Sequence, residues 1–435
     1  MGGSNLGFAI GPHRLPIMQG RTDKTSTVLI IQHSIDEKYQ FSLNLKSNSN
    51  SNSNSKTQKK QKPNLRFEQV NIPGTRFALT HIHINQLKLG QSYNLVVTNE
   101  SEQVDIRTFK ALDTDKKKPK LVMASCMSDH LMFENTAMKA WANVSRQQPD
   151  LLLLTGDTCY ADQRTFALVR NDLSLLSRAT RYFETRSRLS LFRLPELIPT
   201  LAIWDDHDFG PNDADGRFSG KGDSLNLFKM FWGDSENSVT KNFKTTDGGV
   251  GFRLSAFGQN FYFMDCRFFH YPGQSYWGHD QKDWLLEGLS RSPNPSWIIQ
   301  GTQFFGGFQK KDSFETHQQV ELLDLMRSLS QSNSPVCFAG GDVHFSDIMQ
   351  IDEELLGYKS YEFTSSSIHS FSHRPKGFSE RSVFGRNREG KDNFLIFETE
   401  ASSVWNIHTQ CLRSNGEKSF SHQAVIARDK QDLVA

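Results

Sequence analysis

The chain has 435 residues and a formal net charge of +2, from 50 lysines and arginines against 48 aspartates and glutamates. One hydrophobic core rarely grows beyond about 250 to 300 residues, so this length predicts a large domain with a smaller companion. The balanced charge gives no field that would indicate nucleic acid, and no specific nucleic-acid binding is expected. No apolar stretch approaches the roughly 20 residues of a spanning helix, so we expect no association with membranes. We also expect a monomer.

The N-terminus and the cysteines bear on the compartment. The first 17 residues are Gly-rich and mixed, and they lack the basic region and apolar core of a signal peptide, so the sequence as it stands is typical of a cytoplasmic protein. The five cysteines are odd in number and widely spaced, which favours free or metal-bound thiols over disulfides. Localisation stays open.

The N-terminal part predicts a small all-β domain. Short runs rich in β-branched and aromatic residues, several of them alternating, are separated by Gly and polar turns. They lie at residues 27–32, 77–84, 93–98 and 104–109. The Ser/Asn-rich and then basic segment 47–62 cannot bury apolar area, and we expect a disordered loop there. We therefore predict an immunoglobulin/fibronectin-like β-sandwich over residues 1–117.

After the polar linker 114–120 the pattern changes to buried strands alternating with helical segments, which indicates an α/β domain over residues 118–435. A helix is expected over 135–144, with Ala137, Met138, Trp141 and Val144 on one face. The predicted strands lie at residues 121–124, 151–155, 200–204, 261–265, 297–300 and 336–339.

Four of these strands end in polar clusters. The clusters are Ser125-Cys126, Gly156-Asp157 with Tyr160, Asp205-Asp206-His207-Asp208, and Gly341-Asp342-Val343-His344. A single acidic turn after a strand has about an even chance of being only a cap or a solvated loop. The carboxyl ends of strands in layered α/β folds face a common crevice, however, so four clusters together predict one site.

The chemistry of these side chains predicts two different cations. A thiolate from Cys126 and a phenolate from Tyr160 favour ferric iron over zinc, although each residue alone is more often part of a core. Asp157 can bridge two cations. The oxygen ligands of Asp206 and Asp342, with Asn212 as a further candidate, suit a calcium-like or magnesium-like position.

Histidine chemistry predicts a catalytic acid beside this site. Three carboxylates around His207 repel one another unless cations or protons compensate. With Asp206 as ligand, His207 would be oriented by Asp208 and protonate a leaving group. Two cations about 3.5 to 4 Å apart would activate a hydroxide and polarise a phosphoryl oxygen. Several residues are weaker candidates for shaping the substrate pocket: Arg267, His270, Trp277, His279 and His369.

The motifs resemble a known family. The segments Gly156 to Asp162, Trp204 to Asp208 and Gly341 to His344, in this order and spacing, look like PhoD-type alkaline phosphatases of the metallophosphoesterase superfamily. The segments 264–267 and 278–285 are similar to that family too, so the likeness runs from about residue 120 to 400. It implies an αββα metallophosphoesterase sandwich preceded by the small β domain. Many members are exported through a twin-arginine signal, which this N-terminus does not show.

The resemblance implies a ligand set and an activity. Fe³⁺ would be held by Cys126, Asp157, Tyr160 and His344, and Ca²⁺ by Asp157, Asp206 and Asp342, with His207 as the general acid. The implied reaction is hydrolysis of phosphate monoesters or diesters, with the phosphate ester as the partner. Two alternatives remain open: a non-catalytic metal-binding module of the same fold, and an iron-dependent redox enzyme, which lacks the usual two-His-one-carboxylate set.

Overall fold

A computed structural model describes residues 14–46, 63–100, 102–164, 167–233, 243–246, 248–306, 313–372 and 379–427 of the chain. The expected disordered loop at 47–62 lies outside these residues. In the described part, no helix combines the length and the apolar character that a bilayer crossing requires. All five cysteines are buried free thiols, as their spacing predicted.

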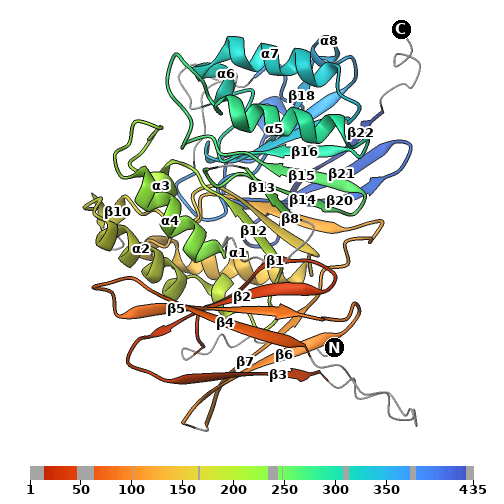
Figure 1. The fold of residues 1–435 in the computed structure, drawn as a ribbon. Coiled ribbons are helices and arrows are strands. Elements are labelled where there is room, and N and C mark those ends of the chain that lie inside the picture. The colour runs from red at the N-terminus through yellow and green to blue at the C-terminus, as the bar shows by residue number, and fades with distance from the viewer. Residues whose placement is uncertain are drawn as a thin grey trace, which may run out of the picture.

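Two small sheets form the N-terminal sandwich, at the bottom of Figure 1. One has the order β1-β2-β5-β4 and the other β3-β6-β7. The strands are β1 (Ile17–Thr22), β2 (Ser26–Ser34), β3 (Tyr39–Leu45), β4 (Asn64–Asn71), β5 (Phe77–Asn85), β6 (Ser92–Asn99) and β7 (Glu102–Lys110). The four runs predicted from the sequence became β2, β5, β6 and β7. Strands β1, β3 and β4 were missed; β1 is fully buried, whereas β3 and β4 have no fully buried residue.

Two larger sheets form the rest of the chain. The six-stranded sheet has the order β12-β9-β8-β20-β21-β22. Its strands are β8 (Lys120–Ala124), β9 (Leu151–Thr155), β12 (Thr200–Ile203), β20 (Asn393–Ala401), β21 (Trp405–Arg413) and β22 (Lys418–Ile426). The seven-stranded sheet has the order β13-β14-β15-β16-β17-β19-β18. Its strands are β13 (Phe243–Thr245), β14 (Phe252–Ala256), β15 (Gln259–Phe263), β16 (Ser296–Ile299), β17 (Val336–Gly340), β18 (Asp347–Ile351) and β19 (Ser360–Thr364).

Aromatic side chains join these two sheets face to face. The ring of Trp297 on β16 lies 5.2 Å from the ring of Phe397 on β20 and 5.3 Å from the ring of Trp405 on β21, measured between centroids. Phe363 on β19 is 5.3 Å from Phe397. Rings of this size bury large apolar areas and prefer such edge-to-face contacts. The core of the larger domain therefore lies between the sheets.

Helices cover the outer faces of both sheets. Figure 1 shows α5 (His279–Ser290) and α7 (Gln319–Ser330) above the seven-stranded sheet, and α1 (Glu134–Arg146) and α2 (Leu175–Arg188) beside the six-stranded sheet. The remaining helices are α3 (Asp206–Phe209), α4 (Lys221–Trp232), α6 (Phe314–His317) and α8 (Glu353–Leu356). Short 3₁₀ turns lie at Leu131–Phe133, Ser190–Arg193 and Gly385–Asn387. Strands β10 (Gln163–Arg164) and β11 (Ala167–Arg170) form a hairpin. The predicted αββα sandwich preceded by a β-sandwich is confirmed.

Strand β2 ties the sandwich to the larger domain because it is buried on both faces. Leu29 and Ile31 pack into the core between the two small sheets. Val28 and Ile30, which point the other way, belong to the core cluster of the larger domain. The domain boundary near residue 118, between β7 and β8, stays a prediction, but the two hydrophobic cores share this strand.

A buried arginine adds to the same joint. Arg186 on α2 lies over the rings of Phe231 and Trp232, 5.2 and 5.3 Å from their centroids, and donates a hydrogen bond of 3.0 Å to the sulfur of Met18 on β1. Burial lowers the pKa of Arg186 to about 9. A cation this deeply buried is held by aromatic faces and carbonyl oxygen rather than by water.

We expect Ile30→Ala to destabilise the whole chain in one transition. Ile30 is fully buried, and truncating such a side chain costs about 2 to 5 kcal/mol of unfolding free energy. Urea unfolding should show a single transition at a lower midpoint, followed identically by tryptophan fluorescence and by circular dichroism. The matched control is Ile35→Ala, because Ile35 is 50% exposed. Separate unfolding of the N-terminal sheets would contradict a shared core.

Candidate metal centre

The structure brings the six predicted ligands together at the carboxyl ends of four strands. Cys126 follows β8, Asp157 and Tyr160 follow β9, Asp206 opens α3 after β12, and Asp342 and His344 follow β17. Strands β8, β9 and β12 run parallel, so their ends meet at one edge. The possible ligand atoms of Cys126, Asp157 and His344 lie within 4.8 Å of one another, and so do those of Asp205, Asp206 and Asp342.

The backbone at these positions is unusual. Four candidate ligands have positive φ angles: Cys126 at 54°, Asp157 at 50°, Asp342 at 67° and His344 at 58°. This left-handed region costs a residue with a β-carbon of the order of 1 to 3 kcal/mol, and such strain concentrates at functional sites. The sharp turns aim the side chains of successive strand ends into one space.

Two glycines allow the strand ends to approach one another. A β-carbon on Gly156 would lie 2.5 Å from the β-carbon of Asp205, and one on Gly341 would lie 2.4 Å from the carbonyl oxygen of Thr155. Both distances are far below van der Waals contact. The two Gly-Asp pairs are therefore packing requirements of the site as well as turns.

One half of the site combines sulfur, phenol and imidazole donors. The hydroxyl of Tyr160 lies 3.4 Å from Nε2 of His344, and Nδ1 of His344 lies 2.5 Å from the carbonyl oxygen of Phe371, to which it donates. Burial raises the pKa of the Cys126 thiol, and the nearby charges of Asp157 and Asp342 raise it further. A thiolate and a carboxylate cannot both be charged here without a positive partner.

The other half is rich in carboxylates. Asp206 accepts a 2.7 Å hydrogen bond from the backbone N–H of Asp213, and Arg267 donates from Nε to Asp205 at 2.5 Å. Arg267 is 1% exposed, so its charge acts at close range. Asp205, which the sequence did not single out as a ligand, belongs to this group, whereas Asn212, a weaker candidate, is exposed. In the sequence, Arg267 could be recognised as a candidate site residue because it lies just after a buried strand.

Asp157 lies between the two halves. It belongs to the group with Cys126 and His344 and to a second group with Asp206 and His207. Its oxygen Oδ1 is buried and accepts no hydrogen bond from the described residues. Burial raises the pKa of Asp157 well above its usual range, with Asp206 and Asp205 acting in the same direction against His207. A buried oxygen in this position fits a bridging cation ligand.

Asp162 holds His207, so the prediction that Asp208 orients this histidine was wrong. Nδ1 of His207 lies 2.8 Å from Oδ1 of Asp162, whose carboxyl is buried. Asp208 instead accepts hydrogen bonds from the backbone N–H groups of Thr158, Cys159 and Asp205, at 3.1, 2.9 and 3.1 Å, and caps α3. Asp208 is adjacent in sequence but faces these amides, which burial forces it to satisfy.

The environment of His207 favours its protonated form. Burial lowers its pKa, but the charges of Asp206, Asp157 and Asp162 outweigh burial and hold the pKa well above its usual range. The ring also stacks on Tyr160, with centroids 4.3 Å apart. Nδ1 is engaged by Asp162, so Nε2 is the nitrogen available to a reacting group.

Solved structures of similar fold identify the fold of the chain. No model of a known protein family matches the chain, and no curated protein sequence matches it. The chain is similar to the structure of PhoD, with a TM-score of 0.64, 14% sequence identity, and coverage of 98% of this chain and 90% of that chain. This is the PhoD fold. The purple acid phosphatase PPD1 from seeds of yellow lupin (Lupinus luteus) is also similar, with a TM-score of 0.64, 13% identity, and coverage of 97% of this chain and 75% of that one.

Two of the weaker pocket candidates are structural parts of this PhoD-like fold. His369 is fully buried, accepts a 2.8 Å hydrogen bond from Nε1 of Trp141, and lies 2.9 Å from the carbonyl oxygen of Ser128. Trp277 is also fully buried and donates to Gln300 at 3.0 Å. Satisfied, buried hydrogen-bonding groups of this kind stabilise a core.

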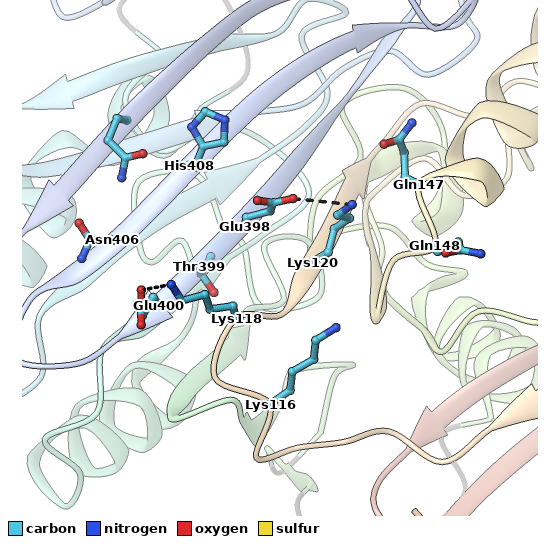
Figure 2. A pocket seen from close by; sticks show the side chains of 11 residues that line it. Lys116, Lys118, Lys120, Gln147, Gln148, Glu398, Thr399, Glu400, Asn406 and His408 are labelled. Atoms are coloured by element: carbon cyan, nitrogen blue, oxygen red, sulfur yellow. Dashed lines mark ion pairs between the residues drawn. The ribbon is translucent and has the colours of Figure 1, made fainter. Parts of the chain in front are cut away.

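A separate hollow of about 480 Å³ lies at the amino end of β8, opposite the end that carries Cys126. Figure 2 shows two of its lysines beside carboxylates: Lys118 pairs with Glu400 at 3.0 Å and Lys120 with Glu398 at 3.6 Å. These pairs are partly exposed, and exposed ion pairs of this kind are typical of a solvated surface.

We expect Asp157→Asn to change stability in opposite directions with and without cations. In protein stripped by a chelator, neutralising a buried carboxylate should raise the unfolding free energy by about 1 to 3 kcal/mol. In protein supplied with cations, the variant should be less stable than the wild type because it binds them more weakly. Thermal melts with and without EDTA measure this, with exposed Asp36→Asn as control. The same sign in both conditions would contradict a shared ligand.

Proposed function

We propose that the chain hydrolyses phosphate esters at a site that holds Fe³⁺ and Ca²⁺. The observation that carries the proposal is the position of His207: an imidazole held at Nδ1 by Asp162 lies beside Asp157, which is common to both ligand groups. A purely structural metal site has no use for such an acid. The similarity in fold to PhoD and to a purple acid phosphatase supports the same conclusion.

The donor chemistry supports a different cation at each of the two positions. Cys126, Tyr160 and His344, together with Asp157, suit ferric iron, because thiolate and phenolate are strong donors to a trivalent ion. Asp206 and Asp342, together with Asp157, would suit calcium. When bound, such cations polarise a phosphoryl oxygen and lower the pKa of water.

The chain's own residues handle the proton. His207 donates from Nε2 to the alcohol oxygen as the P–O bond breaks, and Asp162 holds Nδ1 so that the ring keeps its orientation. Asp205 is neutralised by Arg267, which leaves Asp206 and Asp342 as the anionic ligands that face the second cation. The positive φ angles keep these groups in place before substrate binds.

The proposal is tested by His207→Ala. Turnover of a chromogenic phosphate ester should fall by about 10²- to 10⁴-fold, the usual contribution of a general acid. The content of iron and calcium should not change, because the histidine acts on the proton. His408→Ala, on β21, is the control and should leave both unchanged.

Three results would count against the proposal. Loss of metal together with turnover would make His207 a ligand. Full turnover in His207→Ala would show that His207 is not the general acid. An absence of turnover in metal-loaded wild type would favour a non-catalytic metal-binding module of the same fold.

Removing Asp162 should move the alkaline limb of the pH profile. Asp162 helps to raise the pKa of His207, so Asp162→Asn lowers that pKa, and the protonated acid is lost at a lower pH. The alkaline limb of kcat should therefore shift toward acid, with a smaller kcat at high pH. The matched control is Asp208→Asn, because Asp208 binds backbone amides instead of His207. A shift of the alkaline limb in Asp208→Asn but not in Asp162→Asn would instead indicate that Asp208 orients His207.

A further inference from the structure

The candidate site opens to solvent on one side. Cys126, Asp157 and Asp206 are buried, with at most 3% of each residue exposed. Asp342 and His344 are only half-buried. Asp342 and His344 therefore mark the side of the site that is nearest to solvent, and we call the surface around His344 its entrance.

Phe371 lies at this entrance and is joined to the site. Its carbonyl oxygen accepts from Nδ1 of His344 at 2.5 Å, and the hydroxyl of the preceding Ser370 lies 3.2 Å from the hydroxyl of Tyr160. The side chain of Phe371 is nevertheless 44% exposed. The backbone of this segment is thus fixed by the site, while its ring faces solvent beside it.

Other apolar side chains extend the same surface. The ring of Phe133 meets Phe371 edge to face, with centroids 5.1 Å apart. Leu131 and Met132, the two residues before Phe133, are 45% and 58% exposed. We call the exposed side chains of Leu131, Met132 and Phe371, together with the buried ring of Phe133 that contacts Phe371, the apolar rim. Contiguous exposed apolar side chains at the mouth of a site commonly mark where a ligand packs.

The apolar rim is anchored to the site from both segments. The backbone N–H of Ser128 donates to the carbonyl oxygen of His369 at 3.0 Å, and Nδ1 of His369 lies 2.9 Å from the carbonyl oxygen of Ser128. The side chain of His130 accepts from the N–H of Met132 at 3.3 Å and caps the short turn. These bonds hold the two segments together, so the apolar surface keeps its place relative to His344.

We propose that the apolar rim binds the alcohol part of the phosphate ester, so that the preferred substrates are esters of an alkyl or aryl alcohol. This inference rests on the proposed function. Bound cations would attract the phosphate group, whereas Leu, Met and Phe side chains offer it no charge. The alcohol carbons, which leave the phosphorus on the open side, are the part of the substrate that gains from apolar contact.

The test compares two primary alcohols that differ in polarity but leave with similar ease. Hexyl and glyceryl esters, each as a phosphomonoester and as a methyl phosphodiester, give the ratio of kcat/KM for the apolar over the polar alcohol. We expect the wild type to favour hexyl esters. Phe371→Ser and Met132→Ser should each lower this ratio, about tenfold for Phe371→Ser and mainly through KM, and Phe371→Leu should restore most of it.

The control and the outcomes separate this inference from the proposed function. Phe67→Ser removes a phenylalanine that is 49% exposed on β4, in the N-terminal sandwich, and should leave the ratio and both rates unchanged. Turnover by the wild type with no preference for hexyl esters, or with a ratio that none of the rim variants changes, would overturn the rim inference alone. If none of the four esters is turned over by metal-loaded wild type, the proposed function fails first. A rim variant that changes the oligomeric state without changing the ratio would assign the rim to contact between copies of the chain.

Discussion

The candidate site depends on a concentration of buried negative charge around Asp157. Its carboxylate is 1% exposed and shares its surroundings with Asp206 and the Cys126 thiol. Like charges this close in a medium of low polarity raise one another's pKa and oppose folding unless a positive charge balances them. Arg267 and His207 supply part of that charge, and cations would supply the rest. The strained turns and the glycines that allow them are the structural cost of bringing these groups together.

That charge cluster depends on a rigid support. Parallel strands β8, β9 and β12 set the spacing of three strand ends, and the aromatic contacts between the two large sheets fix the position of the fourth, after β17. The N-terminal sandwich contributes to the same body through β2, whose two faces enter two different cores. A strand used in this way makes the sandwich part of the scaffold rather than a loosely attached module.

Much of this arrangement could be predicted from the sequence, and the failures have physical causes. The runs before Cys126, Asp157, Asp206 and Asp342 are short and continuously apolar, which predicts buried strands with polar ends. The orientation of His207 could not be predicted, because Asp208 is its neighbour in the chain while Asp162 is its neighbour in space. Adjacency in sequence does not show that Asp208 accepts hydrogen bonds from backbone amides while Asp162 contacts His207. Strands β21 and β22 were missed because buried and less buried residues alternate along them, which gives a weaker signal than a fully buried strand. Strand β20 was missed although its first five residues are buried.

We propose that one site combines an iron-type and a calcium-type position. Elemental analysis of the wild-type chain, purified without chelator, tests this in the same fraction whose hydrolysis of a phosphate ester is measured. We expect about one iron per chain together with calcium, and visible absorption from thiolate or phenolate bound to iron. Zinc alone in an active fraction, or activity in a fraction that holds no metal, would contradict it.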